Sequence, residues 1–291
     1  MTRREESGFI LVAALWMLAA LAALASAYAV YAARTAPSAA LPEERLRAEA
    51  AIRAGIELCA YRQLGWPKPA RPDAGAFTAA VGSSRIDVAW RSENARVDLN
   101  TAPRDLIAGL FAQLGAPPAT AGFLADRIAA WRGRLRDSER QREAAIYAKA
   151  GLPYGPLGAP FDNALEISLL PGMSPDLAER ALRFLTVFGA GRIDPLVADP
   201  IVLAALPGAT PGVVKTLLAL RDGPRPDPSA LTRIAGPAKD FVAVDPSDNV
   251  RAEIVATLGG RRIRAQVVLR ITESAPAPYE ILYWRDDFDG E

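Results

Sequence analysis

The feature that most constrains this chain is an uncharged run of 25 residues, from position 9 to position 33. At about 1.5 Å of rise per residue, this run would form a helix of roughly 37 Å, long enough to cross a ~30 Å hydrocarbon core with some tilt. A cleaved secretory signal is the alternative, and Arg3, Arg4 and the "ASA" at positions 25–27 suit it. Because the run exceeds the roughly 7–15 apolar residues of such a signal, we predict a membrane-spanning helix.

The junction between the polar leader and this run is a second signal. The leader ends in Gly8, and the aromatic Phe9 follows it directly in "SGF". This junction resembles the type IV prepilin leader, which a dedicated peptidase cuts after the glycine before it methylates the new amino terminus. The resemblance implies cleavage between Gly8 and Phe9, with Phe9 as the N-methylated first residue of the mature chain.

The composition excludes several classes of function. The chain has no histidine, which excludes histidine-based catalytic triads and zinc–histidine sites. Its 34 basic and 33 acidic residues give no global positive charge that would recruit nucleic acid. Cys59 is the only cysteine, so we predict a small apolar residue on a helix. Since nucleotide-binding and hydrolase motifs are absent from the sequence, we predict that the protein is not an enzyme and has no cofactor.

The segment after the apolar run is predicted as helix, loop and strands. Pro37 and Pro42 should kink or interrupt the helix, which resumes over residues 43–65 with apolar residues at helical spacing. Residues 66–84 are rich in proline, glycine and alanine and are predicted as loop. The runs "RIDVAW" and "ARVDL", within residues 85–99, predict an antiparallel pair of strands.

The far end of the chain is also predicted as strands. Strand-like runs lie on both sides of Gly259 and Gly260, which predicts a hairpin, and "PYEILYWRD" adds another strand. Between the two strand blocks, residues 100–235 have a helical pattern broken by proline and glycine. Within them, "ARVDLNTAPRDLIAGLFAQLG" from Ala95 resembles "GRIDPLVADPIVLAALPGATP" from Gly191. This internal repeat predicts helical hairpins that turn at "LLPGMS" and "ALPGAT".

These segments together resemble a known family. "VDLNTAPRDLIAGL", "ADRIAAWR", the "LPG" turns, the leader and the closing "YEILYWR" are similar, in order and nearly end to end, to the minor pseudopilin K family of the type II secretion system. The resemblance implies an α+β fold, in which an N-terminal membrane-spanning pseudopilin helix packs on an antiparallel sheet and a large all-α insertion contains SAM-like helical hairpins. The implied domains are a leader (1–8), a transmembrane helix (9–33), the pseudopilin helix with the first strands (34–99), an inserted region with two SAM-like parts (100–235, about 100–190 and 191–235), and the C-terminal strands (236–291).

The same resemblance implies a structural role at the tip of the pseudopilus, where the chain would initiate assembly and support export of folded proteins across the outer membrane. The implied partners are other minor pseudopilins, the major pseudopilin and the prepilin peptidase, with no nucleic acid. The implied location is the bacterial inner membrane, with a single pass and the bulk of the chain in the periplasm. Most pseudopilins have a glutamate at mature position five, which falls on Ala13 when counted from Phe9. The K subunit characteristically lacks this glutamate.

Members of the family are also described with calcium and a disulfide. Cys59 alone cannot form a disulfide within the chain. Asp287, Asp289 and Gly290 resemble the start of a calcium loop, but the sequence ends before a loop of full length, so we predict a solvated acidic terminus and assign no metal ligand.

One alternative from a different class fits the same middle segment. "VDLNTAPRDLIAGL", "RIAAWR" and "LPG" also resemble the helix-hairpin-helix of membrane-anchored competence DNA receptors, in which backbone N–H groups at the turn bind phosphate. That turn normally reads apolar-Pro-Gly-apolar-Gly, whereas Ser174 and Thr210 take the place of the second glycine here. The missing glycine and the charge balance favour the pseudopilin interpretation.

Overall fold

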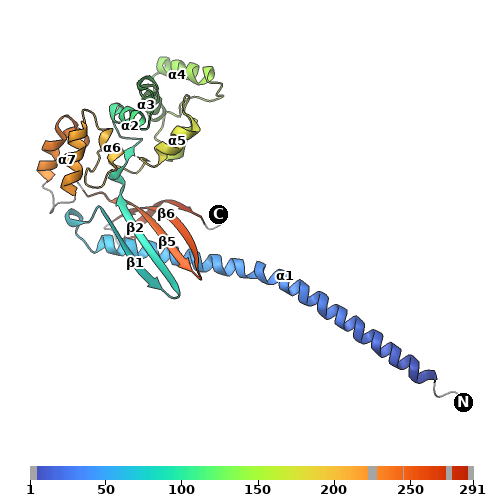
Figure 1. Ribbon diagram of the computed structural model, residues 1–291. Coiled ribbons are helices and arrows are strands. Elements are labelled where there is room, and N and C mark those ends of the chain that lie inside the picture. The colour runs from blue at the N-terminus through green and yellow to red at the C-terminus, as the bar shows by residue number, and fades with distance from the viewer. Residues whose placement is uncertain (1–4, 222–227, 245, 273–276, 288–291) are drawn as a thin grey trace.

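The computed structural model describes residues 5–221, 228–244, 246–272 and 277–287, without the side chains of residues 5–10, 31–44, 69, 228 and 232. Its first element, α1 (Glu5–Leu64), is a single helix of 60 residues, and the N-terminal part projects away from the folded body (Figure 1). The predicted interruption at Pro37 and Pro42 is wrong, because the helix is continuous through both. Each proline removes one helical hydrogen bond and crowds the carbonyl four residues earlier, a cost that the neighbouring alanines, the strongest helix formers, partly offset.

A five-stranded antiparallel sheet covers the C-terminal part of α1. Its strands are β1 (Ala74–Val81), β2 (Ser84–Ser92), β5 (Asn249–Leu258), β6 (Arg261–Ile271) and β7 (Tyr279–Asp286), in the order β1-β2-β5-β6-β7. The N-terminal and C-terminal strand blocks meet where β2 pairs with β5. The α+β fold and the hairpin at Gly259 and Gly260 are confirmed, and both glycines have positive φ, 54° and 90°.

Two predictions in the first strand block are wrong. Residues predicted as loop contain β1, whose alanines and glycine hide the two-residue alternation that marks a strand. Gly75 of β1 lies against the ring of Trp90, which a Cβ on Gly75 would approach to 2.3 Å. The run "ARVDL" does not pair with β2. Instead β3 (Val97–Asp98) pairs in parallel with β4 (Leu185–Thr186), because the short helical turn η2 (Glu93–Ala95) redirects the chain after β2.

The helix and the sheet share one apolar core. Cys59 is completely buried in it, as predicted, and burial raises the pKa of its thiol to about 12. Gly55 lets α1 approach β5 closely, since a Cβ there would lie 2.7 Å from a methyl group of Ile254. The buried residues from α1 are Ala51, Ile52, Ile56, Cys59 and Ala60, and those from β2 include Ile86, Val88 and Trp90.

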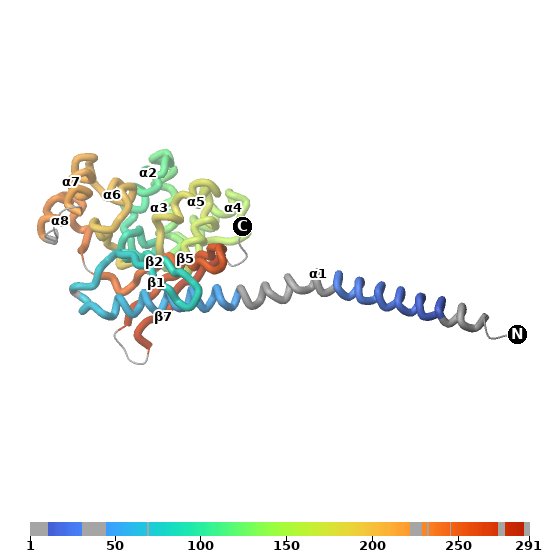
Figure 2. The backbone as a smooth tube through the Cα atoms, turned by 60° about the horizontal axis from the view of Figure 1, so that its bottom comes forward, coloured from blue at the N-terminus to red at the C-terminus, as the bar shows by residue number. Residues whose placement is uncertain are grey.

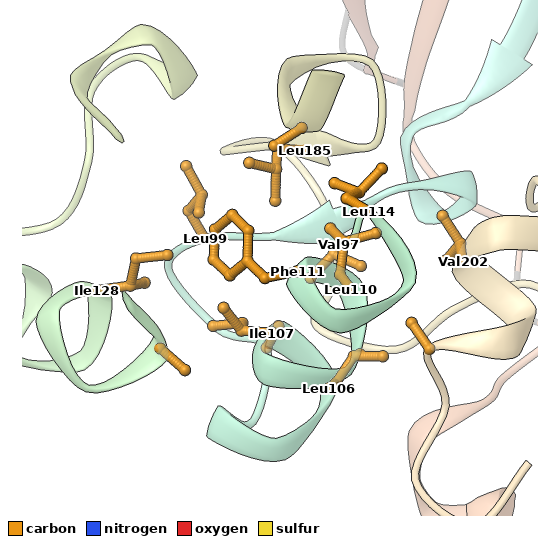
Figure 3. Close-up of a cluster of buried hydrophobic side chains, with 14 of the residues drawn as sticks. Val97, Leu99, Leu106, Ile107, Leu110, Phe111, Leu114, Ile128, Leu185 and Val202 are labelled. Carbon is orange, nitrogen blue, oxygen red and sulfur yellow. The ribbon is translucent and has the colours of Figure 1, made fainter. Parts of the chain in front are cut away.

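The chain between β2 and β5 is mainly helical. Its helices are α2 (Arg104–Gln113), α3 (Pro118–Arg132), α4 (Asp137–Lys149), α5 (Pro175–Leu182), α6 (Pro200–Ala204), α7 (Pro211–Arg221) and α8 (Pro228–Ala235), with the 3-10 turns η3 (Ala164–Leu169) and η4 (Gly236–Phe241). They form a second core, in which Phe111 of α2 lies among aliphatic side chains from α2, α3, β3 and β4 (Figure 3). This core is separate from the one under the sheet.

The internal sequence repeat corresponds to a repeated structure. Asp98 and Asp194 are both buried, and each accepts at its backbone carbonyl a hydrogen bond from the amide four residues later. Arg132, at the end of α3, donates to the carbonyls of Leu99 (2.5 Å) and Ala102 (2.8 Å), which follow Asp98 by one and four residues. Arg221, at the end of α7, donates in the same way to the carbonyls that follow Asp194 by one and four residues, at 2.7 Å and 2.5 Å. The two hairpins, α2–α3 and α6–α7, are thus closed in the same way. In each, the arginine at the end of the second helix binds the segment that precedes the first helix.

The two hairpins contact each other where α2 crosses the end of α6. A Cβ on Gly109 would lie 2.2 Å from the backbone oxygen of Ala205, so only glycine fits at this position. We therefore predict that Gly109→Ala lowers the free energy of unfolding by about 1–3 kcal/mol, although alanine normally favours a helix by about 1 kcal/mol over glycine. Chemical denaturation followed by circular dichroism measures the change.

Gly122→Ala in α3 is the matched control. Its added methyl group would approach only the flexible end of the Arg104 side chain, at 3.3 Å, so this variant should keep or gain stability. Equal losses in the two variants would contradict the close contact between the hairpins.

Candidate assembly surfaces

The first candidate surface is the apolar part of α1. Leu11–Val30 is a stretch of 20 residues with a mean hydropathy of 2.0, and none of it is buried against the rest of the described chain. At about 1.5 Å per residue it measures ~30 Å, the thickness of a bilayer core. Its large side chains are openly exposed, for example Trp16 at 74% and Leu24 at 68%. This helix therefore has the length and composition of a single-pass membrane anchor.

The predicted processing and assembly residues lie along this helix. Gly8 and Phe9 fall within α1, and their side chains are outside the described part of the structure. Ala13 lies one turn further on and is partly exposed. The N-terminal part of α1 projects away from the folded body in both views (Figures 1 and 2), and Leu11–Val30, which contains Ala13, is not buried against the rest of the described chain.

The second candidate feature is the joint between the sheet and the helical region. Glu93 of η2 is completely buried, and its carboxylate pairs with the guanidinium of Arg251 on β5 at 2.7 Å and 3.0 Å. The hydroxyl of Thr186 on β4 also donates to this carboxylate. One acidic side chain therefore connects the sheet to the parallel β3–β4 pair. Sequence reasoning missed Glu93, because a single glutamate after a strand carries no pattern that indicates burial.

Two asparagines extend the joint. Asn94 accepts from the amide of Ala190 at 3.1 Å, and its backbone oxygen accepts from the amide of Asp194 at 2.9 Å. Asn249, at the start of β5, donates to the carbonyl of Phe188 at 2.6 Å. These bonds join the chain at its exit from the sheet, and again at its return, to the same segment of the insertion, residues 188–194, which orients the helical region relative to the sheet.

Arg96 adds a desolvated charge beside this joint. Burial is the main cause that lowers its pKa to about 10, and the nearby positive charge of Arg251 lowers it further. Its guanidinium remains protonated at neutral pH and donates to the carbonyl of Leu182 at 3.4 Å. Arg96 therefore contributes a second contact between the segment after η2 and the end of α5.

Both "LPG" segments form turns, but only "ALPGAT" is the predicted bend of a repeat hairpin, between α6 and α7. The segment "LLPGMS" instead joins η3 to α5, and the hairpin of α2 and α3 turns at residues 114–117. Gly172 and Gly208 have φ values of 82° and 75°, and α5 and α7 begin directly after them. The hydroxyls of Ser174 and Thr210 each accept the backbone N–H of the third helical residue, at 3.3 Å. In a DNA-binding hairpin, free backbone N–H groups at this place would face phosphate. Here a side-chain hydroxyl oxygen already accepts a hydrogen bond from one of these N–H groups in each turn, which favours the pseudopilin interpretation over the DNA receptor.

The acidic terminus is only partly described. Asp287 accepts the backbone N–H of Arg264, and Asp286 accepts the indole N–H of Trp284 at 2.6 Å. Asp289, Gly290 and Glu291 lie outside the described residues. Among the residues that the structure describes, no cluster of three or more acidic or cysteine side chains is arranged to hold a metal ion.

The buried pair at the joint gives a direct prediction. Glu93→Ala leaves Arg251 without its carboxylate in a site where the arginine side chain is only 12% exposed. We expect a loss of about 3–5 kcal/mol in the free energy of unfolding, measured by chemical denaturation. Glu280→Ala, which removes the exposed partner of Arg270 at 3.5 Å, is the control and should cost less than about 1 kcal/mol. A small effect of Glu93→Ala would show that the joint does not depend on this ion pair.

Comparison with known proteins agrees with this architecture. Residues 85–190 match the sequence model of protein K of the type II secretion system. No curated protein matches the chain. Among solved structures, a chain of the GspK-GspI-GspJ complex from the type 2 secretion system of enterotoxigenic Escherichia coli has a similar fold, with a TM-score of 0.61 and 16% identity. The match covers 84% of this chain and 96% of that one. Residues 85–190 are thus similar to a type II secretion protein K domain, and the fold of the chain is similar to that of a chain in this complex.

Proposed function

We propose that this chain is the minor pseudopilin at the tip of a type II secretion pseudopilus, where it initiates assembly and supports export of folded proteins across the outer membrane. The observation that carries the proposal is the protein K domain, placed on a long helix with an exposed apolar stem. Its partners would be other minor pseudopilins and the major pseudopilin, as the GspK-GspI-GspJ assembly of the similar structure suggests. The stem would lie in the inner membrane, with the folded body in the periplasm.

The position at the tip is supported by where the helical region lies. It sits on the side of the sheet away from α1, at the end remote from the apolar stem (Figure 1). In a filament whose subunits stack along their helices, this bulk would obstruct a subunit that adds beyond it. Subunits would then add only on the membrane side, which suits a first subunit.

Ala13 fits the same position. In similar filaments, a glutamate at mature position five is thought to meet the terminal amine of the subunit already in place. An ion in lipid without a partner costs roughly 2.5–3.5 kcal/mol on insertion scales. A subunit that enters first has no amine beyond it, and alanine avoids this cost. The terminal amine of Phe9 would then form an ion pair with the glutamate at mature position five of the next subunit.

We also propose the domain division at residues 34–99, 100–235 and 236–291. Separate apolar cores under the sheet and within the helical region support it. The two hairpins are closed by equivalent hydrogen bonds from Arg132 and Arg221, and this supports the further division of the helical region near residue 190.

The leader gives the first test of this function. We expect the mature chain to begin at an N-methylated Phe9 when it is produced together with a prepilin peptidase, as measured by mass spectrometry of the amino-terminal peptide. Gly8→Leu should leave the leader in place, whereas Ser7→Ala, the control, should be processed normally. A mature chain that begins at Tyr28 would instead indicate signal peptidase cleavage and would refute a pilin-type leader.

Labelling of assembled pseudopili gives the second test. We expect gold-labelled antibody against the helical region to mark one end of each pseudopilus in electron micrographs, because the first subunit stays at the tip. Deletion of the chain should reduce the number of pseudopili or remove control of their length. Labels repeated along the shaft would contradict a position at the tip.

A further inference from the structure

A groove lies where β2 leads from the sheet into the helical region (Figure 1). Its volume is about 540 Å³, within the roughly 300–1,000 Å³ of pockets that hold ligands. One wall is the face of β1, β2 and β5 that points away from α1, and it carries Arg91 and Arg251. The other wall is formed by the end of α5 and the start of α6, with Arg183 and Asp199. Arg96, which follows η2, also lines the groove.

The positive charges of this groove are not balanced by ion pairs. Arg91 and Arg251 lie directly opposite each other in the β2–β5 pairing, where like charges are destabilising. Arg251 is paired with the buried carboxylate of Glu93. Within the described part of the chain, Arg91, Arg96 and Arg183 form no ion pair. Burial is the main cause that lowers the pKa of Arg96, and the charges of Arg251 and Arg91 contribute to it.

Two carboxylates also line the groove, and both have other partners. Asp199 caps α6, where it accepts the amide of Ile201 at 2.9 Å, and Glu253 accepts the side-chain amide of Gln266 at 3.4 Å. The groove therefore offers guanidinium donors together with carboxylate acceptors. A peptide segment with acidic side chains supplies carboxylates to the guanidinium groups and backbone N–H groups to the acceptors. A phosphate group supplies only acceptors and more negative charge, which Asp199 and Glu253 repel.

We propose that this groove binds a short acidic segment of a partner protein, whose carboxylates pair with the guanidinium groups of Arg91, Arg96 and Arg183. A guanidinium group presents N–H donors in a planar fork that matches a carboxylate. The negative charge of the segment also reduces the repulsion between Arg91 and Arg251. This site depends on the groove alone and goes beyond a position at the tip of a pseudopilus.

Fluorescence anisotropy with labelled peptides tests the chemistry of the ligand. The full chain in detergent would be titrated with the peptide AEAEA and with AQAQA, which has the same length without the charges. AEAEA should bind at least about tenfold more tightly at low salt, and its affinity should fall as the salt concentration rises. Equal affinities would overturn the proposal. Inorganic phosphate that competes at a lower concentration than unlabelled AEAEA would also overturn it, because the groove would then be a phosphate site.

A pair of substitutions on α5 separates the groove from the rest of the surface. Arg183→Gln should weaken binding of AEAEA by about fivefold to tenfold, because it removes a guanidinium group from the groove. Arg180→Gln makes the same change of charge three residues earlier, outside the groove, and should bind like the original chain. Equal losses in the two variants would show that the peptide responds only to the overall charge. Self-association of the chain that only Arg183→Gln abolishes would assign the groove to a second copy and overturn the proposal.

Arg91→Gln adds a readout that a structural role would not give. This variant should bind AEAEA about tenfold more weakly, while the melting temperature of the chain alone stays the same or rises, because the repulsion from Arg251 is removed. Arg85→Gln, on the same strand but outside the groove, is the control and should leave peptide binding unchanged. A lower melting temperature of Arg91→Gln, with the loss of binding, would show that Arg91 stabilises the sheet and would count against the site.

Discussion

The contact between the carboxylate of Glu93 and the guanidinium of Arg251 orients the rest of the structure. The carboxylate lies where the chain leaves the sheet for the helical region, and the guanidinium lies on the strand to which the chain returns. Removing two such charges from water costs several kcal/mol per ion, which is offset only by close pairing and further hydrogen bonds. Both oxygens of Glu93 contact Arg251, and Thr186 adds a third contact. A large insertion is thereby held at one orientation on a small sheet.

This fixed orientation matters because α1 has different surroundings along its length. Its C-terminal part is buried by the sheet, with Gly55 allowing close approach to Ile254, while its N-terminal part is exposed and apolar. The stem alone would let the folded body take any position above a membrane. Rigid attachment of the sheet to the helix, and of the helical region to the sheet, gives the body a defined direction relative to the stem. In the proposed function, a subunit that starts a filament would need that direction, because the next subunit would pack along the same helix.

The contacts that close each helical hairpin explain how a region with many prolines and glycines keeps a unique shape. Arg132 and Arg221 donate to carbonyls that follow a buried aspartate, and Gly109 allows the hairpins to touch. These contacts satisfy backbone oxygens that would otherwise be left without partners near the ends of short helices. The two LPG turns leave Ser174 and Thr210 as helix caps.

The sequence by itself determined the features that depend on local pattern. The uncharged run predicts the first part of α1, the paired glycines at 259 and 260 predict the β5–β6 hairpin, and the repeat around Asp98 and Asp194 predicts two hairpins. The burial of Cys59 on α1 agrees with its prediction as a small apolar residue on a helix. Tertiary structure decided what depends on distant partners. β1 is a strand because β2 and Trp90 lie beside its small residues, and β3 pairs with β4 because η2 turns the chain away from β2. Glu93 is buried because Arg251, far away in sequence, supplies its opposite charge.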